Sequence, residues 1–158
     1  MLKNVMLILL CGVSISLCAQ TPAGKRTLRT YWEKNPEAIK EEVKAYIDDE
    51  DTTLHGPCIA YYPEGAKWKE LNYVNNLLEG EVTEYYRSGK VMLKYNYVHG
   101  KKEGQYASYA QNGMYIQKAM YKNDLLFGDV EEYGAKGTIV KTAEFKSNTL
   151  DGTMKSYF

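Results

Sequence analysis

The sequence predicts an all-β protein, an elongated single-layer antiparallel meander of tandem 24-residue β-hairpin repeats. Three regularities predict this fold class: a glycine every 24 residues, a second glycine nine residues later, and a tyrosine five residues after the first glycine. A fixed period of this kind indicates a repeat architecture and takes precedence over local propensity. The columns are Gly56, Gly80, Gly104, Gly128 and Gly152, then Gly65, Gly89, Gly113 and Gly137, then Tyr61, Tyr85, Tyr109, Tyr133 and Tyr157.

Each copy contains two turn signals, separated by runs rich in Tyr, Val, Ile and Thr. Asn112-Gly113 and its equivalents form the first signal, and Asn-Gly favours a two-residue hairpin turn in which both residues have positive φ. Asn75-Asn76 and its equivalents form the second, and asparagine and glycine tolerate the left-handed region. Each copy is therefore predicted to be a hairpin, and successive hairpins join into a meander.

These turns predict the pairing register. Counting outward from a two-residue Asn112-Gly113 turn, Gly104 faces Tyr121, so that the ring would cover the bare glycine backbone. A wide apolar stripe of Leu78, Val82, Tyr95, Tyr97 and their equivalents is the expected packing face. On the opposite face, a narrow stripe pairs Tyr61 with Trp68, Tyr85 with Met92, Tyr109 with Ile116, and Tyr133 with Val140.

The narrow stripe is the candidate partner-contact surface. One interpretation is a structural ladder of cross-strand pairs, which contribute roughly 0.2–1 kcal/mol each. The other is a partly exposed surface for a partner, because exposed apolar strips mark interaction sites and Tyr and Trp are favoured interface anchors. Both interpretations remain open at this point.

Residues 1–19 have the pattern of a signal peptide, which predicts an exported protein, periplasmic or secreted. Lys3 precedes an apolar run that is too short for a membrane span, and small residues follow it. A lipid anchor on Cys18 is disfavoured because Leu17 stands where that motif needs a small residue. Residues 20–26 are expected to form a flexible lead.

The segment 27–55 has two interpretations, a degenerate first repeat or an N-terminal cap containing a helix. Asn35-Pro36-Glu37 is a good helix start, whereas Ile39, Val43, Ala45 and Ile47 alternate as in a strand. Residues 56–158 then hold four full repeats and a final strand. That strand, 153–158, would leave an open edge, which makes edge-to-edge self-association conceivable.

Composition and motifs indicate a non-enzyme. The formal net charge is zero, without the basic patch that a nucleic-acid partner requires. His55 and His99 lie in unrelated columns, no cofactor or metal motif is present, and the acidic run 48–53 lacks a calcium-loop pattern. Cys58 occupies an apolar column and is interpreted as a small buried hydrophobe, with a reactive or intermolecular thiol as the alternative.

The repeat resembles the MORN-repeat variant family in its glycine, its paired aromatics Tyr85-Tyr86, its Ser88-Gly89 turn and a strand ending in Tyr97. Bacterial members of this family are often labelled antitoxin-component-like. The resemblance covers 54–158 well and 31–47 loosely. It departs at Lys102, Ala110 and Gly134.

The resemblance implies a curved antiparallel sheet used for protein or membrane contacts, without a shared active site. We therefore expect an exported, non-catalytic module that binds a protein or an envelope component. The alternatives are an antitoxin-like partner of a toxin and a membrane- or glycan-surface binder.

Overall fold

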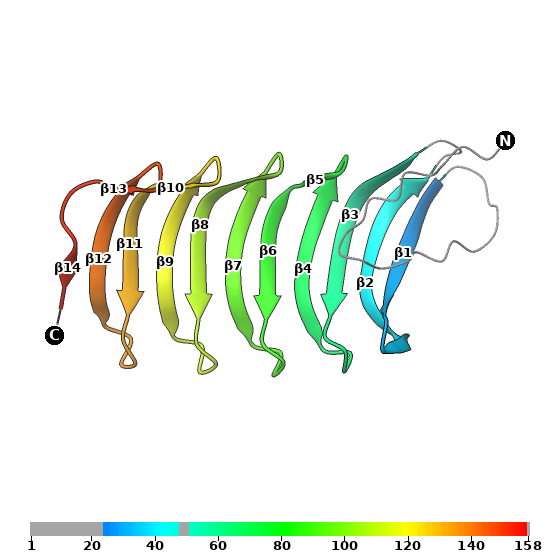
Figure 1. Cartoon of the computed structure of the whole chain (residues 1–158), viewed down its shortest axis with the longest axis horizontal. Coiled ribbons are helices and arrows are strands. Elements are labelled where there is room, and N and C mark those ends of the chain that lie inside the picture. Colours follow the sequence, from blue (N-terminus) through cyan, green and yellow to red (C-terminus); the bar gives the residue numbers. More distant parts are fainter. Residues whose placement is uncertain (1–23, 48–50, 158) are drawn as a thin grey trace.

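The described part of the chain, residues 24–47 and 51–157 of a computed structural model, forms one open antiparallel sheet (Figure 1). The expected signal peptide, residues 1–19, lies outside the described residues. The strands are β1 Gly24–Trp32, β2 Asn35–Ile47, β3 Thr52–Tyr61, β4 Lys67–Val74, β5 Leu77–Leu78, β6 Gly80–Tyr85, β7 Val91–Val98, β8 Lys101–Tyr109, β9 Tyr115–Lys122, β10 Leu125–Leu126, β11 Gly128–Tyr133, β12 Ile139–Lys146, β13 Thr149–Leu150 and β14 Lys155–Ser156.

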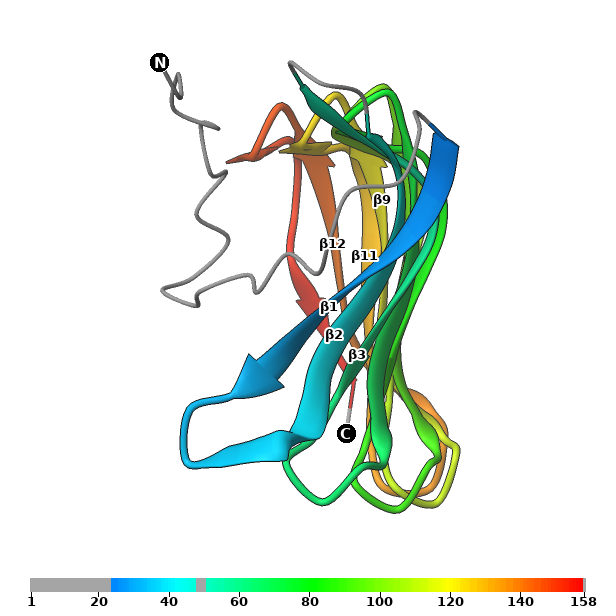
Figure 2. The same cartoon turned by 90° about the vertical axis from the view of Figure 1, so that its right-hand side faces the viewer.

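The long strands β1 to β4, β6 to β9, β11 and β12 are neighbours in the sheet in the order of the sequence, so the predicted meander is confirmed. The short strands β5, β10 and β13 continue from the turns at one end of the long strands and lead into the next hairpin (Figure 1). Figure 2 shows that the sheet is curved and twisted, with the β1–β2 hairpin crossing the following strands at an angle. This twist is the usual consequence of right-handed strand geometry.

The first hairpin decides between the two interpretations of residues 27–55. Gly24–Trp32 and Asn35–Ile47 pair as antiparallel strands, so the helical cap is not formed in the described residues. The hairpin is irregular near its turn, where Tyr31 pairs with Ile39 and Trp32 with Asn35. The prediction of a flexible lead over residues 20–26 is wrong for 24–26, which belong to β1, and residues 20–23 lie outside the described residues.

The second turn signal forms the expected left-handed two-residue turns. Asn75 and Asn76 have φ values of 49° and 67°, and Asn123 and Asp124 have 51° and 68°. These values are those of type I′ turns, whose twist matches that of the flanking strands.

The first turn signal behaves differently, and the two-residue prediction is wrong there. Gly113 donates its N–H to the carbonyl of Ala110 at 2.8 Å, and Ala110 donates to the carbonyl of Met114 at 2.8 Å. Of Asn112 and Gly113, only the glycine has positive φ, 86°. The loop therefore has three residues, a type I turn followed by a left-handed glycine.

This longer loop shifts the register next to the turn. Tyr109 pairs with Tyr115 rather than with Ile116, and a β-bulge restores the predicted register at Ser108, which pairs with Gln117. The predicted pairs of the narrow stripe are therefore wrong in all four copies. Tyr61 pairs with Lys67, Tyr85 with Val91, and Tyr133 with Ile139.

Beyond the bulge the register agrees with the prediction, and Gly104 pairs with Tyr121. The reason for the glycine differs from the one we expected. No side chain lies within 4 Å of the position that a Cβ at Gly104 would take, so no ring fills the place of the missing side chain. Its φ of +82° is the constraint, because a residue with a Cβ is strained in that region.

The second turn of each copy is hydrogen-bonded to the residue two positions before that copy's first glycine, a feature not predicted from sequence. Asn76 donates its N–H to the carbonyl of Leu54 at 2.9 Å, and Leu54 donates its own N–H to Asn76 Oδ1 at 2.7 Å. Asn148 repeats both bonds with Leu126. Gly100 makes only the first, to the carbonyl of Leu78 at 2.9 Å.

The core is a thin layer on the face of the wide stripe, as predicted. Val82 and Cys58 are each 1% exposed, and Tyr95 is 8% exposed. Burial of an aliphatic side chain such as Val82 contributes roughly 1.5–3 kcal/mol. The rings on this face form edge and tilted contacts, with Tyr95 5.8 Å from Tyr97 and 6.3 Å from Tyr106 between ring centroids.

Candidate interaction surfaces

The eight residues of the predicted stripe do not form a single stripe. Tyr61, Tyr85, Tyr109 and Tyr133 lie on one face and form what we call the tyrosine row. Trp68, Met92, Ile116 and Val140 form a separate apolar row, because the bulge displaces them from the tyrosines. The ring of Trp68 lies against Tyr62, with centroids 6.3 Å apart, and Tyr62 follows Tyr61 in the chain. Since successive strand residues point to opposite faces, the apolar row lies on the face opposite the tyrosine row.

The tyrosine row is bound into the sheet by polar contacts. The Tyr85 hydroxyl donates to the Glu70 carboxylate, and this hydrogen bond raises the pKa of Tyr85 to about 12. Lys67 donates to the same carboxylate at 2.5 Å, and its hydrogen bond is the main reason that the pKa of Glu70 is lowered. The Tyr133 hydroxyl donates to Glu131 at 2.5 Å.

Three rings of this face lie side by side where the chain has an extra tyrosine. Tyr115 lies 4.9 Å from Tyr109 and 5.6 Å from Tyr133 between ring centroids. The ammonium of Lys118 lies 4.1 Å from the centroid of the Tyr115 ring, a cation–π distance. Sequence analysis did not single out Tyr115 or Lys118, since neither belongs to a repeating column.

The apolar row runs beside a column that holds the second residue of each aromatic pair. In two copies this residue is tyrosine, and its hydroxyl donates to a backbone carbonyl of the next copy. Tyr62 donates to Tyr85 at 2.8 Å, and Tyr86 donates to Tyr109 at 2.7 Å. The guanidinium of Arg87 lies 4.8 Å from the centre of the Tyr62 ring and also pairs with Glu64.

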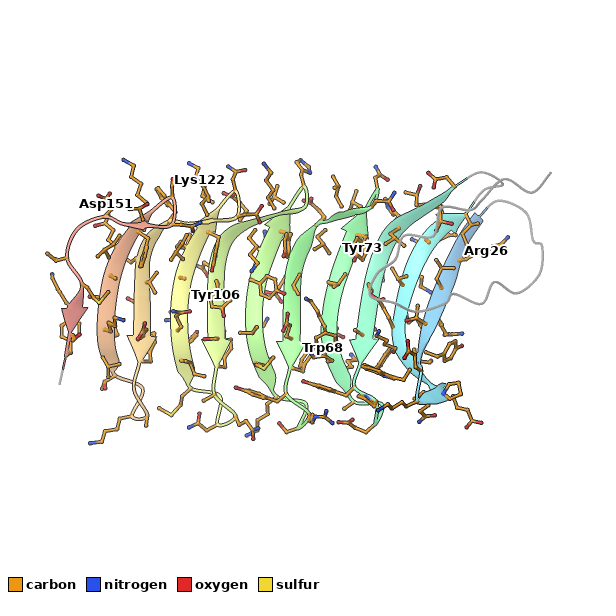
Figure 3. All side chains as sticks on the ribbon, viewed as in Figure 1. Arg26, Trp68, Tyr73, Tyr106, Lys122 and Asp151 are labelled. Carbon is orange, nitrogen blue, oxygen red and sulfur yellow. The ribbon has the colours of Figure 1, made fainter. Side chains whose placement is uncertain are left out.

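In the other two copies the second aromatic is absent, as Ala110 and Gly134 show. Ile116 is 46% exposed and Val140 is 36% exposed. A Cβ placed on Gly134 would meet Val140 Cγ1 at 2.8 Å, so this glycine brings the backbone directly against the apolar row. The row therefore packs against an aromatic ring at Trp68 and against bare backbone at Val140. Figure 3 shows Trp68 near the turn end of the strands, away from the central rings of Tyr73 and Tyr106.

The packed face, which lies opposite the tyrosine row, carries a partly buried polar cluster. Lys69 and Glu84 form an ion pair at 3.0 Å, and the Tyr95 hydroxyl donates to Glu84 at 2.7 Å. Burial, and then this hydrogen bond, raise the pKa of Tyr95. Lys102, which replaces the leucine of the other copies, lies 5.0 Å from the ring centre of Tyr95 and 5.4 Å from that of Tyr121.

Cys58 is buried and donates from Sγ to Glu41 Oε1 at 3.1 Å. Burial, and then the neighbouring Glu41 charge, raise the pKa of the Cys58 thiol. A raised pKa keeps the sulfur protonated, whereas the thiolate is the reactive form. These properties fit the interpretation of Cys58 as a packed side chain.

Among the described residues, no group of three or more His, Cys, Asp and Glu side chains is placed to hold a metal ion. The histidines make local contacts instead. His55 Nδ1 lies 3.2 Å from Asn75 Oδ1, and His99 Nδ1 lies 3.3 Å from Glu79 Oε2. Within residues 24–47 and 51–157, no helix is long and apolar enough to cross a bilayer.

The sequence model of the MORN repeat variant matches residues 54–75 and 78–99. These two stretches contain the paired aromatics Tyr61-Tyr62 and Tyr85-Tyr86. The search of curated proteins finds no match to this chain. MORN repeats are a non-catalytic family, and they commonly serve as modules that bind proteins or membranes.

Proposed function

We propose that this array of MORN repeat variants is an exported, non-catalytic module that binds another protein of the cell envelope through its apolar row. The exposure of Ile116 beside Ala110 is the observation that carries the proposal. An isoleucine that is 46% exposed, next to a position where other copies hold a ring, leaves apolar surface for a partner to cover.

The surroundings of the row support a protein partner. Trp68 and Tyr62 provide aromatic anchors, and Arg87 lies over the Tyr62 ring. Trp, Tyr and Arg are the residues that contribute most often to binding energy in protein interfaces. The long sheet presents these side chains at regular intervals, so an extended partner could contact several copies at once.

The export part of the proposal depends on residues 1–19 and on their signal-peptide pattern. Expression of the full chain in a host with an envelope, followed by mass measurement of the purified product, tests it. We expect a product that starts at or near Gln20. A full-length product retained in the cytoplasm contradicts the export part and leaves the binding part unaffected.

The binding part is tested by cross-linked affinity capture from the envelope fraction of the native cell. Two matched variants use neighbouring residues of similar exposure on opposite faces, Val140→Asp on the apolar row and Ile139→Asp as the control. We expect Val140→Asp to reduce capture of the specific partner at least tenfold and Ile139→Asp to leave it unchanged. Equal capture by both variants would show that the apolar row is not the contact surface.

Ile116→Ser provides a second test with a smaller change. We expect it to weaken capture without altering the thermal unfolding midpoint, because the side chain is nearly half exposed. The double variant Trp68→Ala and Met92→Ala is less specific, since Trp68 packs against Tyr62. Unfolding of that double variant would assign these two residues to the structural part of the row.

A further inference from the structure

The tyrosine row contains one place where two phenol rings face each other across neighbouring strands. Tyr109 pairs with Tyr115, and their ring centroids lie 4.9 Å apart with 33° between the ring planes. Residues directly opposite each other in an antiparallel pair have side chains close enough to interact. In the other three copies the residue opposite the row is not aromatic: Lys67, Val91 and Ile139.

The hydroxyl ends of these two rings lie together. Burial, and then the nearby Tyr115 side chain, raise the pKa of Tyr109, an effect that requires the two phenol groups to be close. Phenoxyl radicals couple at the ring carbons next to the hydroxyl, which are Cε1 and Cε2 in tyrosine. Two tilted rings with adjacent hydroxyl ends bring one such carbon of each ring near the other.

The pair is open to an oxidant at its edge. Tyr115 is 39% exposed. The ammonium of Lys118 lies 4.1 Å from the Tyr115 ring centroid, over the face of the ring, and coupling takes place at the ring edge. On the packed face, by contrast, Tyr95 is 8% exposed and meets Tyr97 with 64° between the ring planes, so a ring edge points at a ring face there.

We propose that Tyr109 and Tyr115 form an oxidative cross-linking site, where hydrogen peroxide and a haem peroxidase join them as dityrosine. Each phenol gives up one electron and one proton and becomes a phenoxyl radical. The radicals couple through a carbon–carbon bond between one Cε of each ring, and the hydrogens on these carbons move to the phenol oxygens. The protein loses two hydrogen atoms in total, and one hydrogen peroxide is reduced to two water molecules.

Tyr133 is the other ring beside Tyr115, and its geometry is less suited to coupling. The two centroids are 5.6 Å apart, farther than those of Tyr109 and Tyr115. The Tyr133 hydroxyl donates to Glu131 at 2.5 Å, which holds the phenol end toward a carboxylate. We therefore expect the bond to form between Tyr109 and Tyr115.

The cross-link would close a short loop around the three-residue turn and join β8 to β9 covalently. It lies on the face opposite the apolar row and needs no binding partner. Its failure would therefore leave the proposed protein contact untouched, and failure of that contact would leave the cross-link untouched.

The sequence offers a direct way to detect this bond. Its single Asn-Gly sequence, Asn112-Gly113, lies between the two tyrosines, and hydroxylamine cleaves Asn–Gly bonds. The purified chain is treated at low concentration with hydrogen peroxide and a haem peroxidase and is then cleaved. We expect the two fragments to stay joined, with dityrosine fluorescence and a mass lower by two hydrogen atoms.

Conservative variants identify the residues involved. Tyr109→Phe and Tyr115→Phe each remove one phenol and should lower the yield of joined fragments at least tenfold. Tyr46→Phe is the matched control, because Tyr46 is 45% exposed and its ring lies beside His55. This control should leave the yield unchanged. Circular dichroism shows whether each variant keeps the sheet.

Three results would overturn the proposal. The first is separation of the fragments after cleavage, whether dityrosine is absent or joins only different chains. The second is a full yield of joined fragments from a folded Tyr115→Phe variant. The third is loss of the two hydrogen atoms within fragment 113–158 alone, which would place the bond between Tyr115 and another tyrosine of that fragment.

Discussion

The two halves of the repeat array share a backbone conformation and differ in the second residue of the aromatic pair. Copies 56–79 and 80–103 carry Tyr62 and Tyr86, whose hydroxyls each bond to a carbonyl one copy further along. Copies 104–127 and 128–151 carry Ala110 and Gly134 at the same place. Both halves keep the left-handed glycines and the type I′ turns.

This difference separates what the fold needs from what can vary. A positive-φ glycine and an Asn-type turn recur in both halves because the backbone conformation of each hairpin requires them. The second aromatic adds a bond between copies that already share a sheet, so the sheet persists where this residue is absent, and Ile116 is 46% exposed there. These two copies also line a hollow of about 310 Å³ over β8, β9 and β11.

The largest effect that we expect is a loss of folding stability at alkaline pH, caused by Tyr73 in the N-terminal half. Burial raises the pKa of Tyr73 from 10.0 to about 12. The folded state binds the Tyr73 hydroxyl proton more tightly than the unfolded state does. The folding stability that this difference contributes is fully present below pH 10 and is lost as the pH rises from 10 through 12. The loss from Tyr73 alone is on the order of 2 kcal/mol.

Urea unfolding at several pH values from 8 to 12 measures this loss. Tyr73→Phe removes the titrating group, so the variant should lose less stability over that interval than the unaltered chain does. An identical pH dependence of the two proteins would contradict the assignment to Tyr73.

The next effect concerns the glycines, and here the two halves should behave alike. Gly80 and Gly104 have φ values of +89° and +82°, and neither has an atom within 4 Å of a Cβ position. Gly80→Ala and Gly104→Ala should therefore each cost about 1–2 kcal/mol through backbone strain alone. Chemical denaturation gives both values. A large cost in one half with none in the other would mean that the halves do not share this backbone requirement.

Much of the fold could be predicted because glycine and asparagine report backbone conformation directly. The 24-residue period, the meander and the pairing of Gly104 with Tyr121 were predicted and are confirmed. The error at Asn112-Gly113 has a physical cause. The same dipeptide suits a two-residue turn and the end of a three-residue turn, and only hydrogen bonds with Ala110 distinguish them.

The candidate surfaces were predicted less well, because a shift of one residue moves a side chain to the other face. The predicted stripe joined Tyr109 to Ile116, which the bulge separates. The absence of an aromatic at Ala110 and Gly134 was visible in the sequence. Tyr115 and Lys118 lie in contact, and no repeating pattern in the sequence could indicate that contact.

A smaller effect tests the difference between the halves directly. Tyr86→Phe removes the hydroxyl that donates to Tyr109 and should cost about 1 kcal/mol, the usual net value of one hydrogen bond. The transplant Ala110→Tyr should give the C-terminal half the same bond and cover part of Ile116. We expect this variant to be slightly more stable and to capture less partner. If Ala110→Tyr leaves capture unchanged, the missing ring is not what makes the apolar row available.

The smallest effect concerns the turn that lacks a side-chain clamp. Asn76 makes two hydrogen bonds with Leu54, whereas Gly100 makes only the backbone bond to Leu78. Gly100→Asn should supply the second bond, because asparagine tolerates the φ of +79° found there. A Cβ at this position meets Leu77 Cδ2 at 3.4 Å, which is ordinary contact with an exposed and adaptable side chain.

We expect Gly100→Asn to stabilise the chain by about 0.5 kcal/mol, from the new bond and from the reduced freedom of the unfolded chain. Asn76→Gly is the matched opposite change and should cost about 1 kcal/mol, because it leaves the Leu54 N–H without its side-chain acceptor. Thermal unfolding of the two variants measures both. Destabilisation by Gly100→Asn would mean that Leu77 cannot adjust, and that the copies differ at this turn for steric reasons rather than through the loss of a dispensable bond.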